Sequence, residues 1–232
     1  EESFRDQRFV EDFCRERSIP LTLRTVDIAA LARKNGLSVE ECGREERYRL
    51  FEELCAREHS LVATAHTQSD NVETVVFHLC RGTGLKGLTG IPPKRGKIIR
   101  PLILATREEV EGYCQREGLP YVTDSSNLQD VYSRNRVRHR VLPELEAVHP
   151  GAKEAIARLS RTLALEEDFL EEEGRRCLDS IRLGEDCSRP GFLALHPAMQ
   201  GRVLALLLKE RGLEVTAQRL TQLMGRAEAG EG

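Results

Sequence analysis

The fold is decided by the stretch LVATAHTQSDNVET, residues 61–74. Small and β-branched residues up to Ala65 predict a buried parallel strand, and the residues that follow predict a helix from about Gln68 to Cys80. The spacing of His66, Asp70 and Glu73 places three polar side chains on one helical stripe. Because helix N-termini and loop amides converge at the carboxyl edge of a parallel sheet, we expect a binding site there.

Helices and strands alternate through the first half of the chain. The apolar spacing predicts helices near 5–17, 39–58 and 68–80, strands at 21–26 and 61–65, and a short strand or extended segment at 98–103. Thr106 and Glu109 form a capping-box pattern that opens a further helix, which Gly118 ends. Repeated β-then-α segments imply an α/β fold with an open parallel sheet. Glycines and prolines over 82–96 predict a loop or hairpin.

The composition changes after His149-Pro150-Gly151, and we place a domain boundary near residue 150. Residues 151–232 carry helical spacing at 152–178, 198–211 and 216–225. The stripe of the first of these helices includes Leu159 and Phe169. We therefore predict an all-α appendage after the α/β part.

Basic residues gather in two acid-free stretches, although the net charge of the whole chain is -3. No Asp or Glu occurs from Thr74 to Arg107, and none occurs in the arginine-rich stretch from Val131 to Pro143. Such segregation can present a cationic face to phosphates even on a slightly acidic protein. The alternative is that these residues lie on solvated loops.

The chain has 7 cysteines and no CxxC pair, which argues against a disulfide framework and a structural zinc site. No run of about 18 apolar residues is present, so we expect no membrane span and a cytoplasmic protein. The chain opens in a helical pattern without an initiator methionine. We therefore expect that a segment upstream of Glu1 is absent.

An ordered series of motifs covers most of residues 1–150. It comprises His66-x-x-x-Asp70-x-x-Glu73-Thr74, Arg81-Gly82-x-Gly84-x-x-Gly87, Arg100-Pro101-Leu102, Thr106-Arg107-x-Glu109, Gly118-Leu119-Pro120, Asp124-x-Ser126-Asn127 and Arg134-Asn135-Arg136-x-Arg138. Together these motifs resemble the tRNA(Ile)-lysidine synthetase family of the N-type ATP pyrophosphatases, also called PP-loop ATPases. The resemblance implies a sheet of the adenine-nucleotide alpha-hydrolase type, incomplete at its N-terminus.

The resemblance also implies a reaction, the ATP-dependent ligation of L-lysine to the wobble cytidine of tRNA(Ile) through an adenylated cytidine. Mg²⁺ would bridge the phosphate oxygens. Residues 1–150 would be the catalytic domain, and residues 151–232 a helical linker and substrate-binding domain. tRNA(Ile) and L-lysine are the implied partners, no membrane is involved, and the sequence is compatible with a homodimer.

We expect the site residues to fall into four groups. The catalytic residues are His66, Asp70, Glu73 and Arg136; Asp70 also binds Mg²⁺; Gly82, Gly84 and Gly87 bind the nucleotide; Arg81, Lys86, Arg134 and Arg138 bind tRNA. The three arginines from 134 to 138 cannot all share one helix face, and one of them could pair with Asp124. Purely structural roles are the alternative, such as a helix first-turn position for Asp70.

Two departures from the family pattern are visible. Thr67 and Ser69 replace a second histidine and a second acid, and the family's Ser-Gly-Gly-x-Asp-Ser phosphate loop does not occur in the 232 residues. The chain is then either a fragment of a working enzyme, inactive alone, which we favour, or a remnant that no longer makes lysidine. A tRNA-thiolating PP-loop enzyme, which the missing paired cysteines disfavour, and a non-catalytic RNA-binding module are the competing hypotheses.

Overall fold

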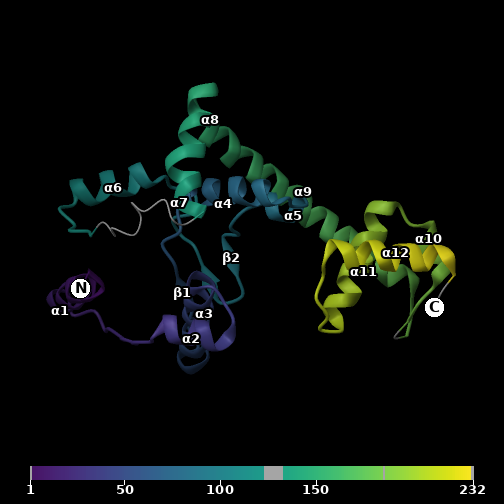
Figure 1. Cartoon of the computed structure of the whole chain (residues 1–232), viewed down its shortest axis with the longest axis horizontal. Coiled ribbons are helices and arrows are strands. Elements are labelled where there is room, and N and C mark those ends of the chain that lie inside the picture. Colours follow the sequence, from purple (N-terminus) through teal and green to yellow (C-terminus); the bar gives the residue numbers. More distant parts are fainter. Residues whose placement is uncertain (1, 123–132, 185, 231–232) are drawn as a thin grey trace. The chain divides into compact units, whose positions relative to one another are not determined.

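The computed structural model describes residues 2–122, 133–184 and 186–230, which form two compact units (Figure 1). Unit 1 comprises residues 1–83 and 90–158, and unit 2 comprises residues 84–89 and 159–232. The motif at Asp124-x-Ser126-Asn127 and the expected helix start near Val131 lie outside the described residues. Each unit has its own hydrophobic core and is described by itself.

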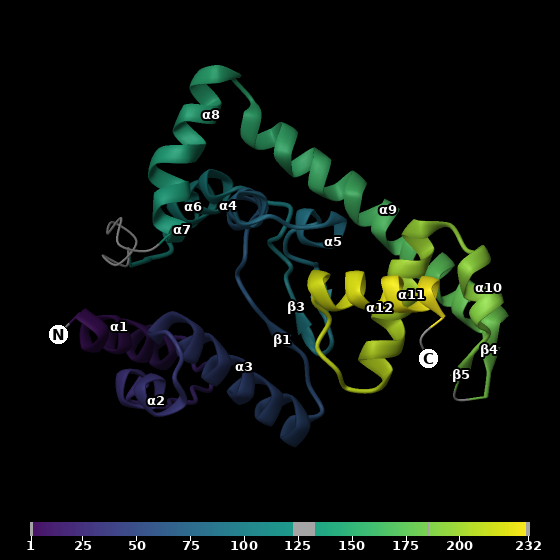
Figure 2. The same ribbon diagram turned by 45° about the vertical axis from the view of Figure 1, so that its right-hand side comes forward.

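The sheet of unit 1 is small and mixed. Strand β1 (Val62–Ala63) pairs in parallel with β3 (Ile98–Ile99), and β3 pairs antiparallel with β2 (Lys94–Arg95), in the order β1-β3-β2. Figure 2 shows β1 and β3 side by side. The parallel pair agrees with the expected α/β fold, whereas β2 makes the described sheet mixed rather than purely parallel.

Helix α4 (Gln68–Arg81) follows β1 and forms as its sequence predicts. The Thr67 hydroxyl accepts a hydrogen bond from the N–H of Asp70, and the Asp70 carboxylate accepts one from the N–H of Thr67. This capping box satisfies backbone donors at the helix start. The apolar face of α4 then enters the core through Val72 and Val76.

Three consecutive short helices supply the other side of this core. They are α7 (Ser133–Arg136), the π-helix η2 (Val137–Val141) and α8 (Leu142–Val148). Val137 and Leu142 pack with Val72 and Val76, and each of these buried side chains contributes roughly 1.5–3 kcal/mol of transfer free energy. The N–H of Leu142 donates to the carbonyl of Val137, the i to i−5 bond of a π-helix. Packing against α4 thus fixes where the side chains of residues 133–141 point.

The remaining helices of unit 1 are α1 (Glu2–Glu16), α2 (Ile28–Asn35), α3 (Val39–Glu58) and α6 (Arg107–Arg116). The capping box of Thr106 and Glu109 opens α6 as predicted. The strand predicted at 21–26 is wrong, because these residues form no strand and Leu21, Leu23 and Val26 are exposed. The sequence reading also missed α2, although Asp27 caps its start and Gly36, in a left-handed conformation, ends it.

Unit 2 is built from helices and one hairpin. Its elements are α5 (Leu85–Leu88), most of α9 (Ala152–Ile181), β4 (Arg182–Leu183), β5 (Asp186–Cys187), α10 (Arg189–Ala194), α11 (Pro197–Glu210) and α12 (Ala217–Ala229). The antiparallel β4–β5 hairpin corrects the prediction of an all-α appendage, and α5 lies in the segment expected to be loop or hairpin.

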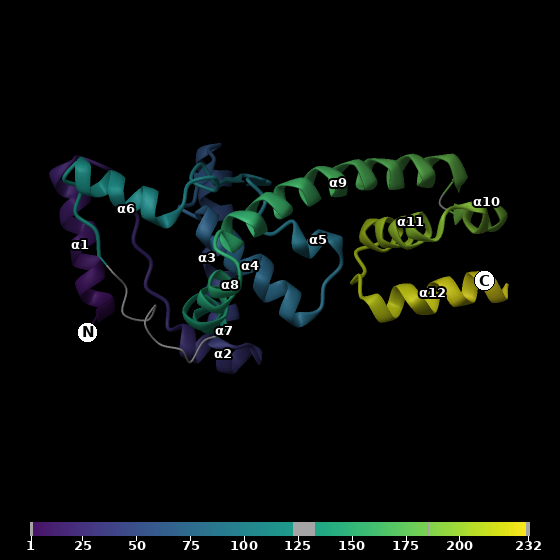
Figure 3. The ribbon, with the colours of Figure 1, turned by 90° about the horizontal axis from the view of Figure 1, so that it is seen from above.

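Helix α9 runs as one continuous helix (Figure 3). Its Leu178 and Ile181 form the core of unit 2 with Phe192 and Val203. Leu159 and Phe169, which the helical spacing placed on the apolar stripe, are instead exposed. Among the described helices, none has the length and hydropathy needed to cross a bilayer.

Candidate functional site

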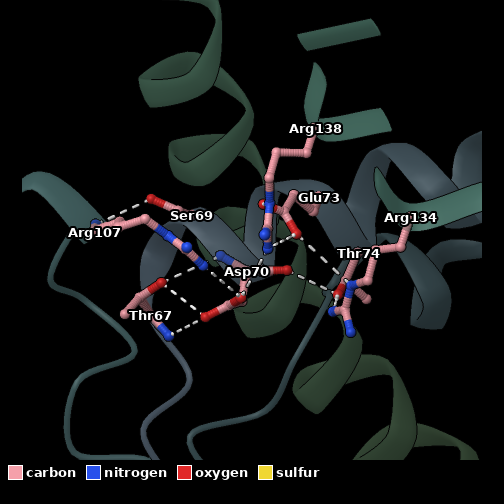
Figure 4. Close-up of polar contacts among 8 residues, drawn as sticks. All are labelled: Thr67, Ser69, Asp70, Glu73, Thr74, Arg107, Arg134 and Arg138. Atoms are coloured by element: carbon pink, nitrogen blue, oxygen red, sulfur yellow. Dashed lines mark hydrogen bonds and ion pairs between the residues drawn. The ribbon is translucent and has the colours of Figure 1, made fainter. Parts of the chain in front are cut away.

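Among the described residues of unit 1, the most deeply buried charge is the carboxylate of Glu73 on α4, a residue that is 2% exposed. Arg138 from η2 donates to its two oxygens, from Nε at 2.6 Å and from Nη2 at 2.9 Å (Figure 4). Arg134 Nε lies 3.7 Å from the same carboxylate. The hydrogen bonds to Glu73 raise the pKa of Arg138, although burial acts in the opposite direction. A bidentate pair of this kind fixes the orientation of both groups.

Asp70 lies one turn before Glu73 and divides its two oxygens between different tasks. Its Oδ2 accepts hydrogen bonds at 2.8 Å from both the N–H and the hydroxyl of Thr67. Its Oδ1 faces Arg138 Nη2 at 3.7 Å and Arg107 Nη2 at 3.8 Å. One oxygen therefore caps α4, while the other helps to balance the positive charge of two guanidinium groups.

We call Glu73, Asp70, Arg134 and Arg138 the Glu73 cluster. Hydroxyl groups on α4 connect this cluster to neighbouring elements. Arg134 Nη2 donates to Thr74 Oγ1 at 2.6 Å, and Thr74 donates onward to the backbone carbonyl of Asp70 at 2.8 Å. Ser69 accepts from the N–H of Arg107 at 3.1 Å, which holds the start of α6 beside the start of α4. Sequence reasoning did not assign roles to Ser69 and Thr74, although both stand in the quoted stretch. Their hydroxyls position the arginines.

His66 lies half-buried at the end of β1 and pairs with Thr64 through its Nδ1, 2.9 Å from the hydroxyl. Burial lowers the pKa of His66, and the charges of Arg100, Arg134 and Arg44 lower it further, while Asp70 acts in the opposite direction. His66 is therefore a neutral imidazole near pH 7. A neutral imidazole can both donate and accept a hydrogen bond.

Arg100 is a further buried cation, which sequence reasoning noticed only as part of a motif. It is 4% exposed, and it donates to the Pro92 carbonyl at 2.7 Å and to the Tyr48 hydroxyl at 3.3 Å. Within the described part of the chain its Nε has no hydrogen-bond partner. The guanidinium groups of Arg44 and Arg95 lie 5.6 and 5.7 Å from the centre of the Tyr48 ring. This gathering of cations can attract a phosphate or another anion.

Within unit 1, two of the predicted cationic residues, Arg136 and Arg81, do not pair with Glu73. Arg136 is exposed, so the structure brings Arg134 and Arg138, and not Arg136, to the carboxylate. Arg81, at the far end of α4, stacks on Phe77 with its guanidinium 5.1 Å from the ring centre. Lys86 belongs to unit 2, where it lies 3.8 Å from Glu171.

The predicted glycines occupy different backbone environments. Gly82 ends α4 with a φ of 76°, Gly84 is the N-cap of α5, and Gly87 lies within α5. Gly90, also with a positive φ, has the clearest steric requirement, because a Cβ there would collide with the side chain of Asn71. Asn71 accepts a hydrogen bond from the N–H of Ile91 at 2.6 Å. This contact fixes the end of the glycine-rich segment against α4.

A family model for the PP-loop domain matches residues 1–145. The chain belongs to the PP-loop domain family. The match spans the capped helix α4, the arginines of α7 and η2, and the buried Arg100. The cluster described above therefore lies inside the PP-loop domain.

Relatives of this PP-loop domain protein carry a common name, tRNA(Ile)-lysidine synthase. The one from Parabacteroides distasonis is 38% identical over 216 residues, 91% of this chain and 48% of the relative. The one from Geobacillus kaustophilus is 38% identical over 89% of this chain and 47% of the relative. The one from Porphyromonas gingivalis strain W83 is 44% identical over 70% of this chain and 36% of the relative. The chain thus spans about half the length of these relatives or less.

Proposed function

We propose that this PP-loop domain protein provides the catalytic part of a tRNA(Ile)-lysidine synthase. In this reaction L-lysine is joined to the wobble cytidine of tRNA(Ile). The reaction cleaves ATP to AMP and pyrophosphate. The observation that carries the proposal is the 38% identity with a tRNA(Ile)-lysidine synthase along 91% of the chain. Residues 1–150 would form the catalytic domain and residues 151–232 the linker and substrate-binding domain.

The proposed reaction has two steps. The carbonyl oxygen of the cytosine attacks the α-phosphorus of ATP, so that an oxygen–phosphorus bond forms and pyrophosphate leaves. The ε-amine of lysine then attacks the ring carbon that carries this oxygen. A carbon–nitrogen bond forms, the carbon–oxygen bond breaks, and AMP leaves with the oxygen. Both steps build negative charge on phosphate oxygens, which fixed guanidinium groups stabilise without reorganisation. Arg134 and Arg138, held by Thr74 and Glu73, are our candidates for this role.

The acids and the imidazole have complementary roles in the proposal. Glu73 and Asp70 hold the arginines in place, so that their guanidinium groups are oriented before substrate binds. His66 is neutral near pH 7 and can accept the proton that the attacking lysine amine must lose. In this proposal Arg138 takes the role expected of Arg136, because Arg138 contacts Glu73 and Asp70 whereas Arg136 is exposed.

The described residues do not fit a resident Mg²⁺ ion. No group of three or more His, Cys, Asp or Glu side chains that could hold a metal occurs among them. Asp70, the predicted ligand, uses one oxygen for its cap and turns the other towards two guanidinium groups, which repel a cation. We therefore assign no step to a metal held by Asp70. A cytoplasmic location and a homodimer stay predictions.

The test is an assay for lysidine formation with the full product of the gene, ATP, tRNA(Ile) and radiolabelled L-lysine. Lysine should become attached to the tRNA, with one AMP and one pyrophosphate released for each lysine. Asp70→Asn should lower this turnover by about 10²-fold or more while tRNA binding changes little, because the amide keeps the cap but removes the charge facing Arg107 and Arg138.

Asp27→Asn is the control, since Asp27 also caps a helix start with its carboxylate: it is the exposed N-cap of α2 and accepts a hydrogen bond from the N–H of Ala30. This variant should retain the parent turnover. Binding of tRNA without any lysine transfer by the folded parent protein would reject the enzyme and support the RNA-binding module. Incorporation of sulfur instead of lysine would support a thiolating enzyme.

A further inference from the structure

A cavity of about 220 Å³ opens beside the Glu73 cluster, entirely within unit 1. It is lined by the first turns of α4, α6 and α9 and by one face of η2 and α8. Burial changes across the lining: Glu73, Val72 and Leu142 are buried, whereas Glu108, Lys153 and Glu154 are exposed. The cavity therefore has a buried side that reaches Glu73 and an open side that carries both signs of charge.

The charged groups on the buried side already have partners within the protein. Glu73 pairs with Arg138, and Arg107 faces Asp70. Glu146 caps α9 by accepting hydrogen bonds from the N–H groups of Lys153, at 2.7 Å, and Gly151, at 3.1 Å. These two bonds hold the pKa of Glu146 below its usual range. The groups thus maintain the shape of the cavity.

The charged side chains on the open side make fewer direct contacts, although the charge of Lys153 also helps to lower the pKa of Glu146. The side chains of Glu108, Lys153 and Glu154 line the cavity, yet none of them makes a hydrogen bond or an ion pair with another of the described residues. Lys153 and Glu154 lie in the first turn of α9, and Glu108 lies in the first turn of α6. One cation and two acids are therefore available to a ligand that itself carries both charges.

An α-amino acid head group has this combination of charges. Its carboxylate fits Lys153 at the positive ends of two helices, and its ammonium fits Glu108 and Glu154. The lining also includes the buried apolar side chains of Val72 and Leu142, which suit a chain of methylene groups. The ε-amine at the end of that chain, which is neutral when it attacks, would then lie at the Glu73 side of the cavity.

We propose that this cavity binds the L-lysine substrate, with Lys153 on its α-carboxylate and Glu108 and Glu154 on its α-ammonium. The inference rests on the proposed function and adds the residues that select lysine. ATP is a poor occupant, because its phosphates would meet Glu108, Glu146 and Glu154 in a cavity below the usual size range for larger ligands.

The test compares substrates that lack one charge of the head group, with the full product of the gene. Lys153→Met should lower kcat/KM for L-lysine by about 10- to 100-fold, chiefly through KM, because a hydrogen bond to a charged group is lost. The same change should alter kcat/KM for cadaverine, which has no carboxylate, by less than about 3-fold. Preference for lysine over cadaverine should therefore collapse in this variant.

The acids are tested in the same way with Nα-acetyl-lysine, which has no α-ammonium. The double variant Glu108→Gln, Glu154→Gln should lose about 10-fold or more with L-lysine and change little with Nα-acetyl-lysine. Glu111→Gln is the control, since Glu111 lies on α6, is exposed and does not line the cavity. It should match the parent with both substrates.

The outcomes separate this inference from the proposed function. Absence of lysine transfer by the folded parent protein ends the proposed function. Transfer that falls by the same factor for lysine and cadaverine in Lys153→Met overturns the lysine cavity alone. A matching fall in tRNA-dependent pyrophosphate release, measured without lysine, would also overturn it, because the cavity would then serve cytidine or ATP.

Discussion

Each unit contains an arginine–glutamate ion pair with the same nitrogen–oxygen distance, but the two pairs differ in their exposure to solvent. Glu73 and Arg138 of unit 1 approach to 2.6 Å with side-chain exposures of 3% and 20%. Glu172 and Arg176, on α9 in unit 2, also approach to 2.6 Å, but with exposures of 60% and 62%. Contact distance alone therefore says little about the consequence of losing a pair.

Solvent explains the difference. Water solvates both members of the exposed pair, so separating them costs little, and such pairs contribute about 0–1 kcal/mol. The buried pair has exchanged its hydration for two hydrogen bonds and for the neighbouring charges of Arg134 and Asp70. Removing one partner leaves the other charged and poorly solvated, which is strongly destabilising.

The largest expected effect is that of Glu73→Gln. It should lower the free energy of unfolding of unit 1 by about 3–5 kcal/mol, because Arg138 and Arg134 lose their buried counter-charge. Glu172→Gln should cost about 0.3–0.5 kcal/mol in unit 2, the value of an exposed pair one helical turn apart. Native-state hydrogen exchange measures both, at amides of α4 for the first and of α9 for the second. Equal losses for the two variants would break the comparison.

A neutral contact sharpens the comparison by removing charge from it. Asn71 is 7% exposed, and its side chain accepts a hydrogen bond at 2.6 Å from the N–H of Ile91. Asn71→Ala should cost about 1–3 kcal/mol, because the buried N–H loses its acceptor. Ser180→Ala is the control, since its hydroxyl donates to the Cys177 carbonyl at 2.7 Å on an exposed surface. A loss below about 0.5 kcal/mol for both, in urea titrations, would show that burial has no influence on neutral contacts.

The smallest expected effect concerns the response of unit 1 to pH. Burial first, and then Arg100, Arg134 and Arg44, lower the pKa of His66 below the unfolded value of 6.5. The unfolded chain therefore takes up a proton as the pH falls through this value, while the folded chain does so only at lower pH, so stability falls in between and then stays level. His66→Gln should remove this slope.

The measurement is the midpoint of thermal unfolding of parent and variant at about pH 7.5 and about pH 5.5. The parent should lose about 1–3 °C more than His66→Gln between these two conditions. Identical losses would mean that His66 takes up its proton at the same pH in the folded and unfolded chains, and would contradict the buried neutral imidazole.

Local signals predicted the elements that depend on local bonds. The capping box of Thr106 and Glu109 lies at the start of α6, and α4 and α9 begin within a residue or two of their expected positions. The strand expected at 21–26 failed because a strand needs a partner far away in sequence, and alternation of Leu21 and Leu23 with polar residues does not supply one. The prediction that Leu159 and Phe169 lie on a buried face was wrong for a similar reason. Periodicity shows that a helix face is apolar, but it does not show that another element covers this face.

The candidate site shows the same contrast between local signals, which the sequence carries, and long-range contacts, which it does not. The quoted stretch placed Asp70 and Glu73 on one face of α4, and spacing indicated that Arg134, Arg136 and Arg138 cannot all share one helix face. The choice of Arg136 was wrong as to contact with Glu73, because Arg134 and Arg138 lie beside this carboxylate. What the sequence did not indicate is which of these arginines meet Glu73. That choice depends on Val137 and Leu142 entering the core against Val72 and Val76.

The wide turn at 137–141 has a consequence for how sequences of this kind diverge. A π-turn accommodates one more residue than an α-turn, and each residue added to or removed from a helix rotates everything beyond it by about 100°. A one-residue deletion between Asn135 and Arg138 would carry the guanidinium away from Glu73, although every surviving side chain remained unchanged. Insertions and deletions, more than substitutions, are therefore the changes that selection should remove from this segment.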